Sequence, residues 1–517
     1  MGEKRGISTE KTTSKSIMMQ GTASSVGKSL LTAALCRVLY QDGYRVVPFK
    51  SQNMALNSYI TDEGMEMGRA QVMQAEAANI KPHVLMNPIL LKPSADTAAQ
   101  VIIKGKVQGN MTAATYHQYK PQLKEMLREV YRELAEEYDV VVLEGAGSPA
   151  EINLMEKDIV NMGMAEIADA PVILVGDIDR GGVFASIYGT IMLLDKYRER
   201  IKGVIINKFR GDKTILEPGL KMLEDLTGVP VLGVIPYGDF DIEDEDSVTE
   251  RFNQKLKGNA KIKIDIIKLP HISNFTDFHI LETFPEVQIR YVKGRDQIKN
   301  PDMIIIPGSK NTIADLKFIR ESGLEKEILT AHKEGSLVFG ICGGYQILGK
   351  WIKDPQGVES SLQEIRGLGL LDIETIFEGE KVTTQVEGVI DKDRISFIDT
   401  QEDFYIKGYE IHMGRTKLGE NTKPFVKIVN KLGEATDYFD GAISEDCRVM
   451  GTYLHGVFDQ LHFTRRLMSY FIEIKGLEPL QEGQLTLEEY KNKEYDKLAK
   501  AFRENVDMEK IYQILGV

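Results

Sequence analysis

The sequence predicts an α/β protein whose first domain is a doubly wound parallel sheet with a P-loop, followed by a second α/β domain. From residue 16 to about 240, short apolar segments alternate with helical patterns, which is typical of such a sheet. A second alternation of this kind starts at residue 262. With 517 residues the chain is also too long for one hydrophobic core.

The first expected strand, residues 17–20, leads into a glycine-rich loop. The loop reads Gly21-Thr22-Ala23-Ser24-Ser25-Val26-Gly27-Lys28-Ser29, and a helical pattern follows from residue 30. Backbone N–H groups and the positive end of the helix would converge there on a phosphate. Lys28 is expected to reach the outer phosphates and Ser29 to hold Mg²⁺. The spacing is unusual, because Thr22 stands where a P-loop normally has its first glycine and Gly21 lies one residue further out.

The other strands expected in this domain are short and continuously apolar, as strands covered on both faces are. They span residues 45–49, 140–143, 172–175, 204–206 and 231–235. A long insertion at 50–138 carries a Met-rich segment that predicts helical core or a substrate platform, and core is favoured because Met fills irregular gaps. The acidic stretch at 239–246 predicts a linker or a solvated edge.

Acidic residues follow two of these strands. Glu144 comes directly after residues 140–143, so we expect it at the carboxyl edge of the sheet, where open α/β folds bind ligands. There it would bind Mg²⁺ opposite Ser29, and capping of the next helix is the alternative. The turn at 176–182, which contains Asp177 and Asp179, predicts either a metal ligand or a structural turn.

The expected strands of the second domain are residues 262–267, 287–292, 303–306 and 337–340. A more β-rich region follows, with strands near 376 and 386 and at 405–411, 425–429 and 449–454. The tail from residue 484 is charged and has a helical period, which predicts a C-terminal cap or interface helix.

Cys342 stands at a sharp turn between an expected strand and an expected helix. The N-terminus of a helix lowers the pKa of a thiol and makes it a nucleophile. The N–H of Gly343 beside it and the N–H of Gly308, after the strand at 303–306, are candidates for an oxyanion hole. Glycines rather than apolar residues surround Cys342, which argues against a structural core thiol.

This nucleophile needs a histidine as base, and the histidine has to come from elsewhere in the chain. His455, at the end of the expected strand 449–454, is favoured, and His412 is the competitor. A nucleophilic cysteine with a distant histidine fits a hydrolase or an acyl transferase.

The segment Gly340-x-Cys342-x-Gly344-x-Gln346 with a late histidine resembles class I glutamine amidotransferases, in which the cysteine releases ammonia from glutamine. The loop at 21–29 resembles that of the dethiobiotin-synthetase-like ligases. The two joined in this order resemble the cobyric acid synthase family, the glutamine-dependent amidases of cobalamin biosynthesis. The most specific marks are residues 47–58, 86–93, 144–148, 177–185 and 206–211.

The resemblance implies amidation of the b, d, e and g carboxylates of adenosylcobyrinic acid a,c-diamide, with one glutamine and one ATP for each and an acyl phosphate as intermediate. It implies ATP and Mg²⁺ as cofactors, a corrinoid and glutamine as partners, and Cys342 and His455 as the glutaminase pair. Asn207 would read the edge of the adenine.

One departure from the amidotransferase class and one difference from a related family bear on this resemblance. Most class I members place a Glu two residues after the histidine, whereas this chain has Val457 there, so Glu410 is a candidate for orienting His455 instead. Residues 49–54 read Phe-Lys-Ser-Gln-Asn-Met, whereas the related cobyrinic acid a,c-diamide synthases carry Phe-Lys-x-Gly-Pro-Asp.

The composition excludes several classes of partner. A net charge of −13 argues against nucleic acid and anionic membrane. Three cysteines argue against a disulfide framework and favour a reducing cytoplasm. Every apolar run is far shorter than the ~20 residues of a membrane span, and the polar residues 1–15 predict a disordered lead-in rather than a signal peptide. Whether the chain forms a homo-oligomer stays open.

We therefore expect an ATP-binding synthetase domain at 16–245, a linker at 246–261, a glutamine amidotransferase domain at 262–475 and a C-terminal helical segment at 476–517. The alternatives are an a,c-diamide synthase or another amidating ligase, and, outside the enzymes, a P-loop switch protein with an inactive glutaminase fold. The intact Cys342 and its glycines argue against the switch protein.

Overall fold

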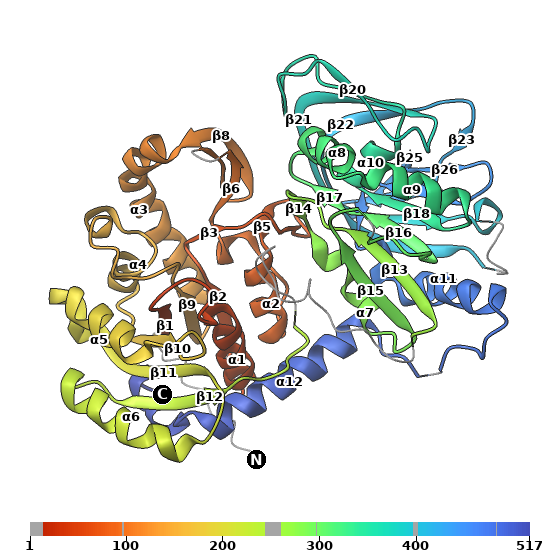
Figure 1. Cartoon of the computed structure of the whole chain (residues 1–517). Coiled ribbons are helices and arrows are strands. Elements are labelled where there is room, and N and C mark those ends of the chain that lie inside the picture. Colours follow the sequence, from red (N-terminus) through yellow and green to blue (C-terminus); the bar gives the residue numbers. More distant parts are fainter. Residues whose placement is uncertain (1–13, 96–97, 243–259, 296, 396–401, 482) are drawn as a thin grey trace, which may run out of the picture.

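The computed structural model describes residues 14–95, 98–242, 260–295, 297–395, 402–481 and 483–517, which form two lobes (Figure 1). The first half of the chain builds one lobe, and the chain from residue 262 to about 475 builds the other. The expected lead-in lies outside the described residues except for 14 and 15, and the expected linker except for 260 and 261.

The first lobe is built on a parallel sheet with the order β12-β11-β10-β1-β9-β2. Its strands are β1 Lys15–Gly21, β2 Val46–Phe49, β9 Val140–Glu144, β10 Val172–Asp177, β11 Ile201–Phe209 and β12 Val231–Pro236. The helices of this half are α1 Lys28–Gln41, α2 Arg69–Ala77, α3 Ala113–Glu137, α4 Met162–Ile167, α5 Val183–Leu193 and α6 Lys213–Thr227. The doubly wound parallel sheet is thus confirmed.

Alternate residues of this sheet enter two separate cores, as the period of a strand requires. Val141 and Leu143 of β9 pack into the core beneath α3 and α5. Val140 and Val142 pack on the opposite face, against α1 and the C-terminal helices α12 Leu487–Asn505 and α13 Met508–Leu515. Helices therefore cover both faces, and the carboxyl ends of the strands are left to form a site.

The insertion between β2 and β9 is a mixed α/β subdomain rather than a purely helical one. It contains β3 Gln52–Met54, β4 Ser58–Ile60, β5 Glu66–Gly68, β6 Ile89–Ala95, β7 Ala98–Ile103 and β8 Lys106–Thr112. A small sheet has the order β3-β6-β7-β8, and β4 pairs with β5. Met67, Met73 and Met86 are buried, as the core interpretation predicts.

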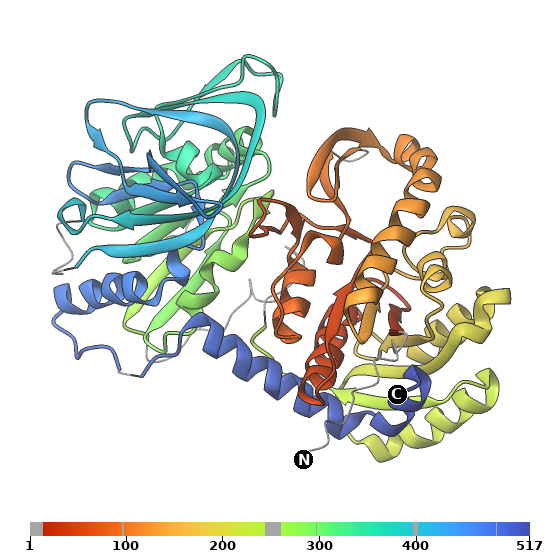
Figure 2. The ribbon, with the colours of Figure 1, turned by 180° about the vertical axis from the view of Figure 1, so that it is seen from behind.

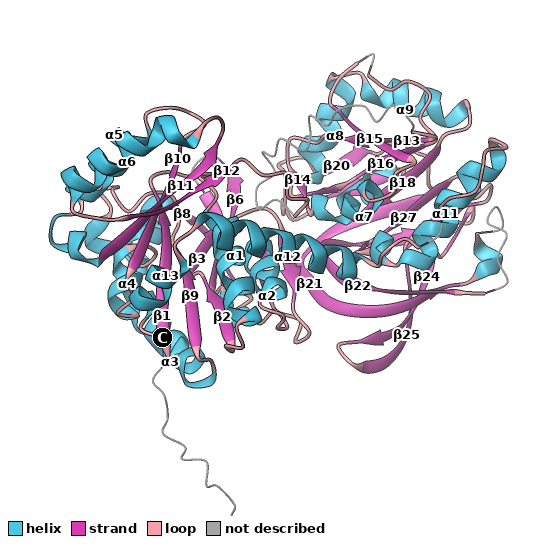
Figure 3. Ribbon diagram, turned by 90° about the horizontal axis from the view of Figure 1, so that it is seen from below, coloured by secondary structure: helices cyan, strands magenta, loops and turns pink. Residues whose placement is uncertain are grey.

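The second lobe contains a sheet with the order β15-β13-β16-β18-β27-β26-β23 and a second sheet with the order β20-β19-β21-β22-β28. The strands are β13 Ile262–Ile267, β14 Ile272–Ser273, β15 Val287–Val292, β16 Met303–Ile306, β17 Gly308–Ser309, β18 Leu337–Ile341, β19 Trp351–Lys353, β20 Glu364–Arg366, β21 Ile373–Ile390, β22 Phe404–Leu418, β23 Thr422–Lys423, β24 Val426–Lys431, β25 Glu434–Asp440, β26 Ala442–Ser444, β27 Val449–Thr452 and β28 Leu454–His455. The helices are α7 His279–Glu282, α8 Thr312–Glu321, α9 Leu324–Lys333, α10 Gly343–Leu348 and α11 Leu461–Ile474. Figure 3 shows β21 and β22 as a long antiparallel pair along this lobe.

The strand expected at 449–454 is divided between the two sheets. β27 pairs with β18, whereas β28 pairs with β22. The break falls at Tyr453, whose N–H turns to the buried Asp440 carboxylate, 3.2 Å from Oδ2. The chain thereby changes sheet just before His455.

The C-terminal tail returns to the first lobe, and α12 runs between the two lobes (Figure 2). Tyr495 and Phe502 of α12 are buried against α1, and Arg37 of α1 pairs with Asp496 at 2.8 Å. The expected interface helix is thus present, but it also completes a core of the first lobe. Within the described residues, every helix is too short or too polar to cross a membrane.

Candidate functional site

The loop after β1 has the backbone of a P-loop. Gly27 has φ +98°, in the left-handed region that favours glycine, and a Cβ there would lie 2.2 Å from Asn207 Nδ2. A Cβ on Gly21 would lie 2.6 Å from Val26 Cγ2, so this position needs a glycine as well. Thr22 donates its N–H to a carbonyl of β10 at 3.0 Å. The displaced glycine therefore meets a packing requirement of this loop.

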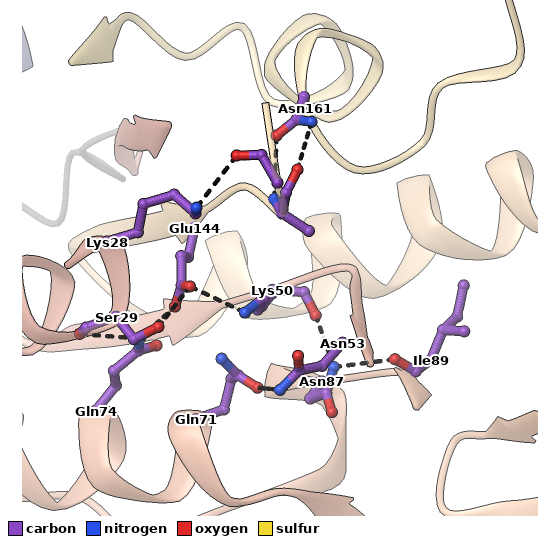
Figure 4. A network of polar contacts seen from close by, with 12 residues as sticks. Lys28, Ser29, Lys50, Asn53, Gln71, Gln74, Asn87, Ile89, Glu144 and Asn161 are labelled. Atoms are coloured by element: carbon purple, nitrogen blue, oxygen red, sulfur yellow. Dashed lines mark hydrogen bonds and ion pairs between the residues drawn. The ribbon is translucent and has the colours of Figure 1, made fainter. Parts of the chain in front are cut away.

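Lys28, at the start of α1, folds back over the loop. Its Nζ donates to Ala23 O at 2.9 Å and to Gly147 O at 3.2 Å (Figure 4). The ammonium group is thus held between the P-loop and the segment that follows β9. This is a position from which it can meet a phosphate in the loop.

Glu144, the last residue of β9, is the centre of a buried polar network (Figure 4). Its Oε1 accepts from Ser29 Oγ at 2.8 Å and from Lys50 Nζ at 2.9 Å, and its Oε2 accepts from Gln74 Nε2 at 2.5 Å. Glu144 is 1% exposed and Lys50 is 4% exposed. A carboxylate at such depth needs these partners, because burial of an unpaired charge is very costly.

Ser29 and Glu144 supply the kind of oxygen donors that suit Mg²⁺. The pair fits that ion, because their side chains meet at the end of the P-loop, where phosphates would supply further oxygens. In the part of the chain that the structure describes, three or more His, Cys, Asp or Glu side chains nowhere gather as a metal site. A protein site of two oxygens completed by phosphates is therefore the arrangement to expect, and metal binding stays a prediction.

Asn207 and Asp177 lie opposite each other in the register of β10 and β11, at the same edge of the sheet. Asn207 is buried beneath the P-loop, and its Nδ2 donates to Val26 O at 2.9 Å. Lys208 donates to Ser25 O at 2.7 Å and pairs with Asp177 at 3.0 Å. Asn207 therefore supports the loop, and its proposed contact with adenine stays a prediction.

A large cavity opens above this edge of the sheet. Its volume is about 1720 Å³, and Lys28, Ser29, Lys50, Glu144 and Asn207 all line it. Further lining residues come from β3, from the chain after β12 and from α12. The residues expected to bind ATP and metal thus face one common space.

Cys342 lies between β18 and α10 and is 7% exposed. Its backbone has φ +52°, an uncommon value for a residue with a side chain, and such strain is frequent at functional sites. The turn is tight: a Cβ on Gly344 would lie 1.9 Å from Ile306 O. The thiol Sγ lies 3.5 Å from Ile411 O, in β22.

His455 is fully buried and its Nδ1 lies 2.7 Å from Asp277 Oδ2. Asp277 belongs to a short 3₁₀ helix, Phe275–Phe278, and its Oδ1 accepts the N–H of Gly456 at 3.1 Å. Burial lowers the pKa of His455, but the Asp277 carboxylate and the Cys342 thiol outweigh it and raise this pKa to about 10. Asp277 and Cys342 thus favour the imidazolium form of His455.

His412 and Glu410 lie on β22, beside the site, but the contacts of their side chains are with other residues. The ring of His412 stacks on Tyr453 at 3.7 Å, and its Nδ1 lies 3.1 Å from Gly414 O. Glu410 accepts from Tyr438 at 3.2 Å and lies 3.8 Å from His412 Nε2. Asp277, not Glu410, therefore contacts Nδ1 of His455.

The two expected oxyanion donors come from different elements close to these side chains. Gly308 pairs with Ser273 across β17 and β14, and a Cβ on Gly308 would lie 3.2 Å from His455 Cε1. Gly343 is the first residue of α10, where backbone N–H groups have no partner within the helix. Both positions are compatible with an oxyanion hole, which stays a prediction.

Sequence reasoning did not assign roles to Asp277, Lys50 and Gln74. Lys50 lies in the segment 47–58, so that segment was the available signal. Asp277 belongs to no recognisable sequence motif. It contacts His455 only because the fold brings together residues 178 positions apart.

Comparisons with known proteins divide the chain in the same way. Residues 17–247 match the family model described as a CobQ/CobB/MinD/ParA nucleotide binding domain. Residues 263–463 match the model described as a CobB/CobQ-like glutamine amidotransferase domain.

Among the relatives is a cobyric acid synthase of Alkaliphilus metalliredigens, which is 63% identical and is matched over 96% of this chain and 99% of its own. Those of a Thermoanaerobacter species and of Clostridium botulinum are 55% and 57% identical, over 96% and 97% of this chain and 98% and 99% of their own. The chain therefore belongs to the cobyric acid synthase family.

Proposed function

We propose that this chain amidates the b, d, e and g carboxylates of adenosylcobyrinic acid a,c-diamide to give adenosylcobyric acid, with glutamine as the nitrogen donor and ATP as the activator. The observation that carries the proposal is that one chain holds both required sites. A cysteine with a carboxylate-paired histidine lies in the second lobe, and a P-loop opens into a cavity of about 1720 Å³ in the first.

In the second lobe, the Cys342 thiolate attacks the carboxamide carbon of glutamine, and the negative charge moves to the carbonyl oxygen. The N–H groups of Gly308 and Gly343 stabilise that oxygen. Collapse of the adduct gives a thioester, and His455 donates its Nε2 proton to the departing ammonia. Water, deprotonated by His455, then hydrolyses the thioester to glutamate.

Asp277 makes this use of His455 effective. Its carboxylate accepts the Nδ1 proton, which leaves Nε2 to exchange a proton with Cys342 and with the leaving nitrogen. Asp277 thereby takes the place of the glutamate that other class I members carry two residues after the histidine.

In the first lobe, ATP with Mg²⁺ supplies the phosphoryl group that turns a poor acyl donor, the corrinoid carboxylate, into an acyl phosphate. Lys28 and the P-loop N–H groups hold the phosphates, and Ser29 and Glu144 would hold the metal ion. Lys50, which forms an ion pair with Glu144 at the same edge of the sheet, adds positive charge where the corrinoid carboxylate approaches. Ammonia then displaces phosphate from the acyl group.

The choice of corrinoid rests on the relatives and on residues 49–54. This segment is built into the site: Lys50 pairs with Glu144, and Asn53 Nδ2 donates to Gln71 at 3.1 Å (Figure 4). A cytoplasmic location is consistent with the need to keep the Cys342 thiol reduced.

The test is a Cys342→Ala variant of the full chain, supplied with ATP, Mg²⁺ and the corrinoid a,c-diamide. Amidation with free ammonia but not with glutamine is expected, and product masses count the amides formed. Cys447→Ala, at a half-buried cysteine of the same lobe, is the matched control and should still use glutamine.

Continued use of glutamine by Cys342→Ala would contradict the role of that thiol. ATP hydrolysis without any amidated corrinoid, from either nitrogen source, would contradict the ligase and favour a switch protein. Amidation of cobyrinic acid at the a and c positions alone would assign the chain to the related diamide synthases.

A further inference from the structure

Asn274 is a buried residue that connects the catalytic histidine to the other lobe. It precedes the 3₁₀ helix of Asp277 and is 3% exposed. Its Nδ2 lies 3.4 Å from Nε2 of His455. Its N–H donates to Asn57 Oδ1 at 2.8 Å, and its Oδ1 accepts the N–H of Ser58 at 3.1 Å. Two residues of the first lobe therefore hold both its backbone and its side chain.

Asn57 and Ser58 end a segment that begins in the ATP cavity. Gln52, Asn53 and Met54 of this segment line the cavity. Asn57 and Ser58 are each 1% exposed, so the contact with Asn274 is buried between the lobes. Two residues, Ala55 and Leu56, thus separate the cavity lining from the contacts with Asn274.

A second contact links the same segment to His455. The hydroxyl of Tyr409 donates to Ser58 O at 3.3 Å, and the Tyr409 ring stacks on the imidazole with a centroid distance of 5.1 Å. A displacement of Ser58 would therefore change the contacts of His455 through both Asn274 and Tyr409.

The hydrogen-bond chemistry of Asn274 determines what it presents to the histidine. Because Ser58 donates to Oδ1, the amide nitrogen must be the atom that faces Nε2. An amide nitrogen is only a donor, so it suits a neutral ring whose Nε2 is an acceptor. It competes with the thiol of Cys342 for that lone pair, and so opposes the effect of Asp277 and Cys342, which raise the pKa of His455 and favour the imidazolium needed for catalysis.

We propose that Asn274 is a positioning residue that couples the glutaminase to the ATP and corrinoid site. Held by Asn57 and Ser58, its amide restrains His455. Ligands bound at Gln52–Met54 move the segment, release the amide and let Nε2 pair with Cys342. The inference rests on the proposed function, because it assumes that the two lobes share one reaction.

The experiment measures glutamate release by the full chain, first with glutamine alone and then with ATP, Mg²⁺ and the corrinoid a,c-diamide added. Asn57→Ala removes the side chain that accepts the N–H of Asn274. Asn274→Gly removes the amide, and glycine readily adopts the backbone φ of +52° at this position. Each variant should raise the rate with glutamine alone at least about fivefold, the lower range of a typical coupling between sites. The ratio of the rate with ATP, Mg²⁺ and corrinoid to the rate with glutamine alone should fall toward one.

Lys381→Met is the matched control. It removes another contact between the lobes, the ion pair of Lys381 with Glu66, and leaves the hydrogen bonds of Asn57 and Ser58 to Asn274 in place. It should leave the rate with glutamine alone unchanged. A pH profile adds a readout beyond structure, since loss of the amide donor should extend the alkaline limb of Asn274→Gly to higher pH.

An unchanged or lower rate with glutamine alone in both variants would overturn the inference, and so would an equal rise in Lys381→Met. Ammonia-dependent amidation by the unmodified chain is measured in parallel. Failure of that reaction would refute the proposed function, whereas its success with an unchanged glutaminase in the variants would refute the coupling alone.

Discussion

Replacement of Asp277 by Asn tests the mechanism of the glutaminase most directly. Asn has nearly the same shape, and its Oδ1 can still accept the N–H of Gly456, now 3.1 Å from the carboxylate. Its NH₂ group would then face Nδ1 of His455, where a carboxylate oxygen lies at 2.7 Å. Nδ1 would have to accept a hydrogen bond, so the ring proton would move to Nε2 and the base would be lost.

The expected loss follows from this buried contact. A hydrogen bond to a charged group contributes ~1.5–3 kcal/mol, and the wrong tautomer adds to its removal. At ~1.4 kcal/mol for each factor of ten, loss of this hydrogen bond alone corresponds to a fall in kcat/KM for glutamine of about 10- to 150-fold, and with the wrong tautomer the fall should be at least about 100-fold. The pKa of His455, now raised to about 10, should also fall, so the alkaline limb of the pH profile should move to lower pH.

The assay is glutamate release from glutamine across pH, with ammonia-dependent amidation as a check on the first lobe. That second activity should stay intact. Glu410→Gln is the matched control, because Glu410 was the candidate that the sequence offered for orienting His455, and it should lower kcat/KM less than about threefold. A kcat/KM of Asp277→Asn within about threefold of the unmodified chain would refute the reasoning.

Three further outcomes are expected. Lys28→Ala should abolish amidation with either nitrogen source and leave glutamate release in the absence of ATP unchanged; residual amidation above about one hundredth would contradict its role. Glu66→Gln should lower the free energy of unfolding by ~3–5 kcal/mol in a denaturant titration, because it leaves Lys92 and Lys381, 2.5 and 2.6 Å from the carboxylate, unpaired between the lobes; a loss below ~1 kcal/mol would contradict this. The pKa of His455 is raised from 6.5 to about 10, so its carboxylate pair stabilises the fold fully below pH 6.5 and loses this effect as pH rises through 10. The Tm difference between the unmodified chain and Asp277→Asn should therefore shrink over that range, and a constant difference would contradict it.

The parallel strands of both lobes could be predicted because each is a short apolar run bounded by turn residues, as at 140–143 and 303–306. In the β-rich region, the strands expected near 376 and 386 are one strand, β21, and β19, β20, β23, β25 and β26 were not predicted. The segment 449–454 was predicted as one strand, but the Asp440 carboxylate accepts the N–H of Tyr453, and the strand is divided there. Such a side-chain acceptor leaves no trace in the hydrophobic pattern.

The site residues could be predicted where a single short segment of the chain determines the local backbone geometry. The P-loop and the turn at Cys342 are local, so their residues could be named from the sequence. Asp277 was missed because a carboxylate that pairs with a histidine needs no spacing or neighbour of a particular type. Asn274 was missed for the same reason, since its partners lie in both lobes.

The position of α12 has a consequence for how the protein is made. The face of the first sheet that carries α1 is completed by residues 487–517, which are translated after the second lobe. While the ribosome synthesises the second lobe, the first has its phosphate loop but not its full apolar cover. Exposed apolar surface of this kind is prone to aggregation. A nascent chain that stops before α12 should therefore be prone to aggregation, and synthesis of α12 and α13 is the step that covers this face of the sheet.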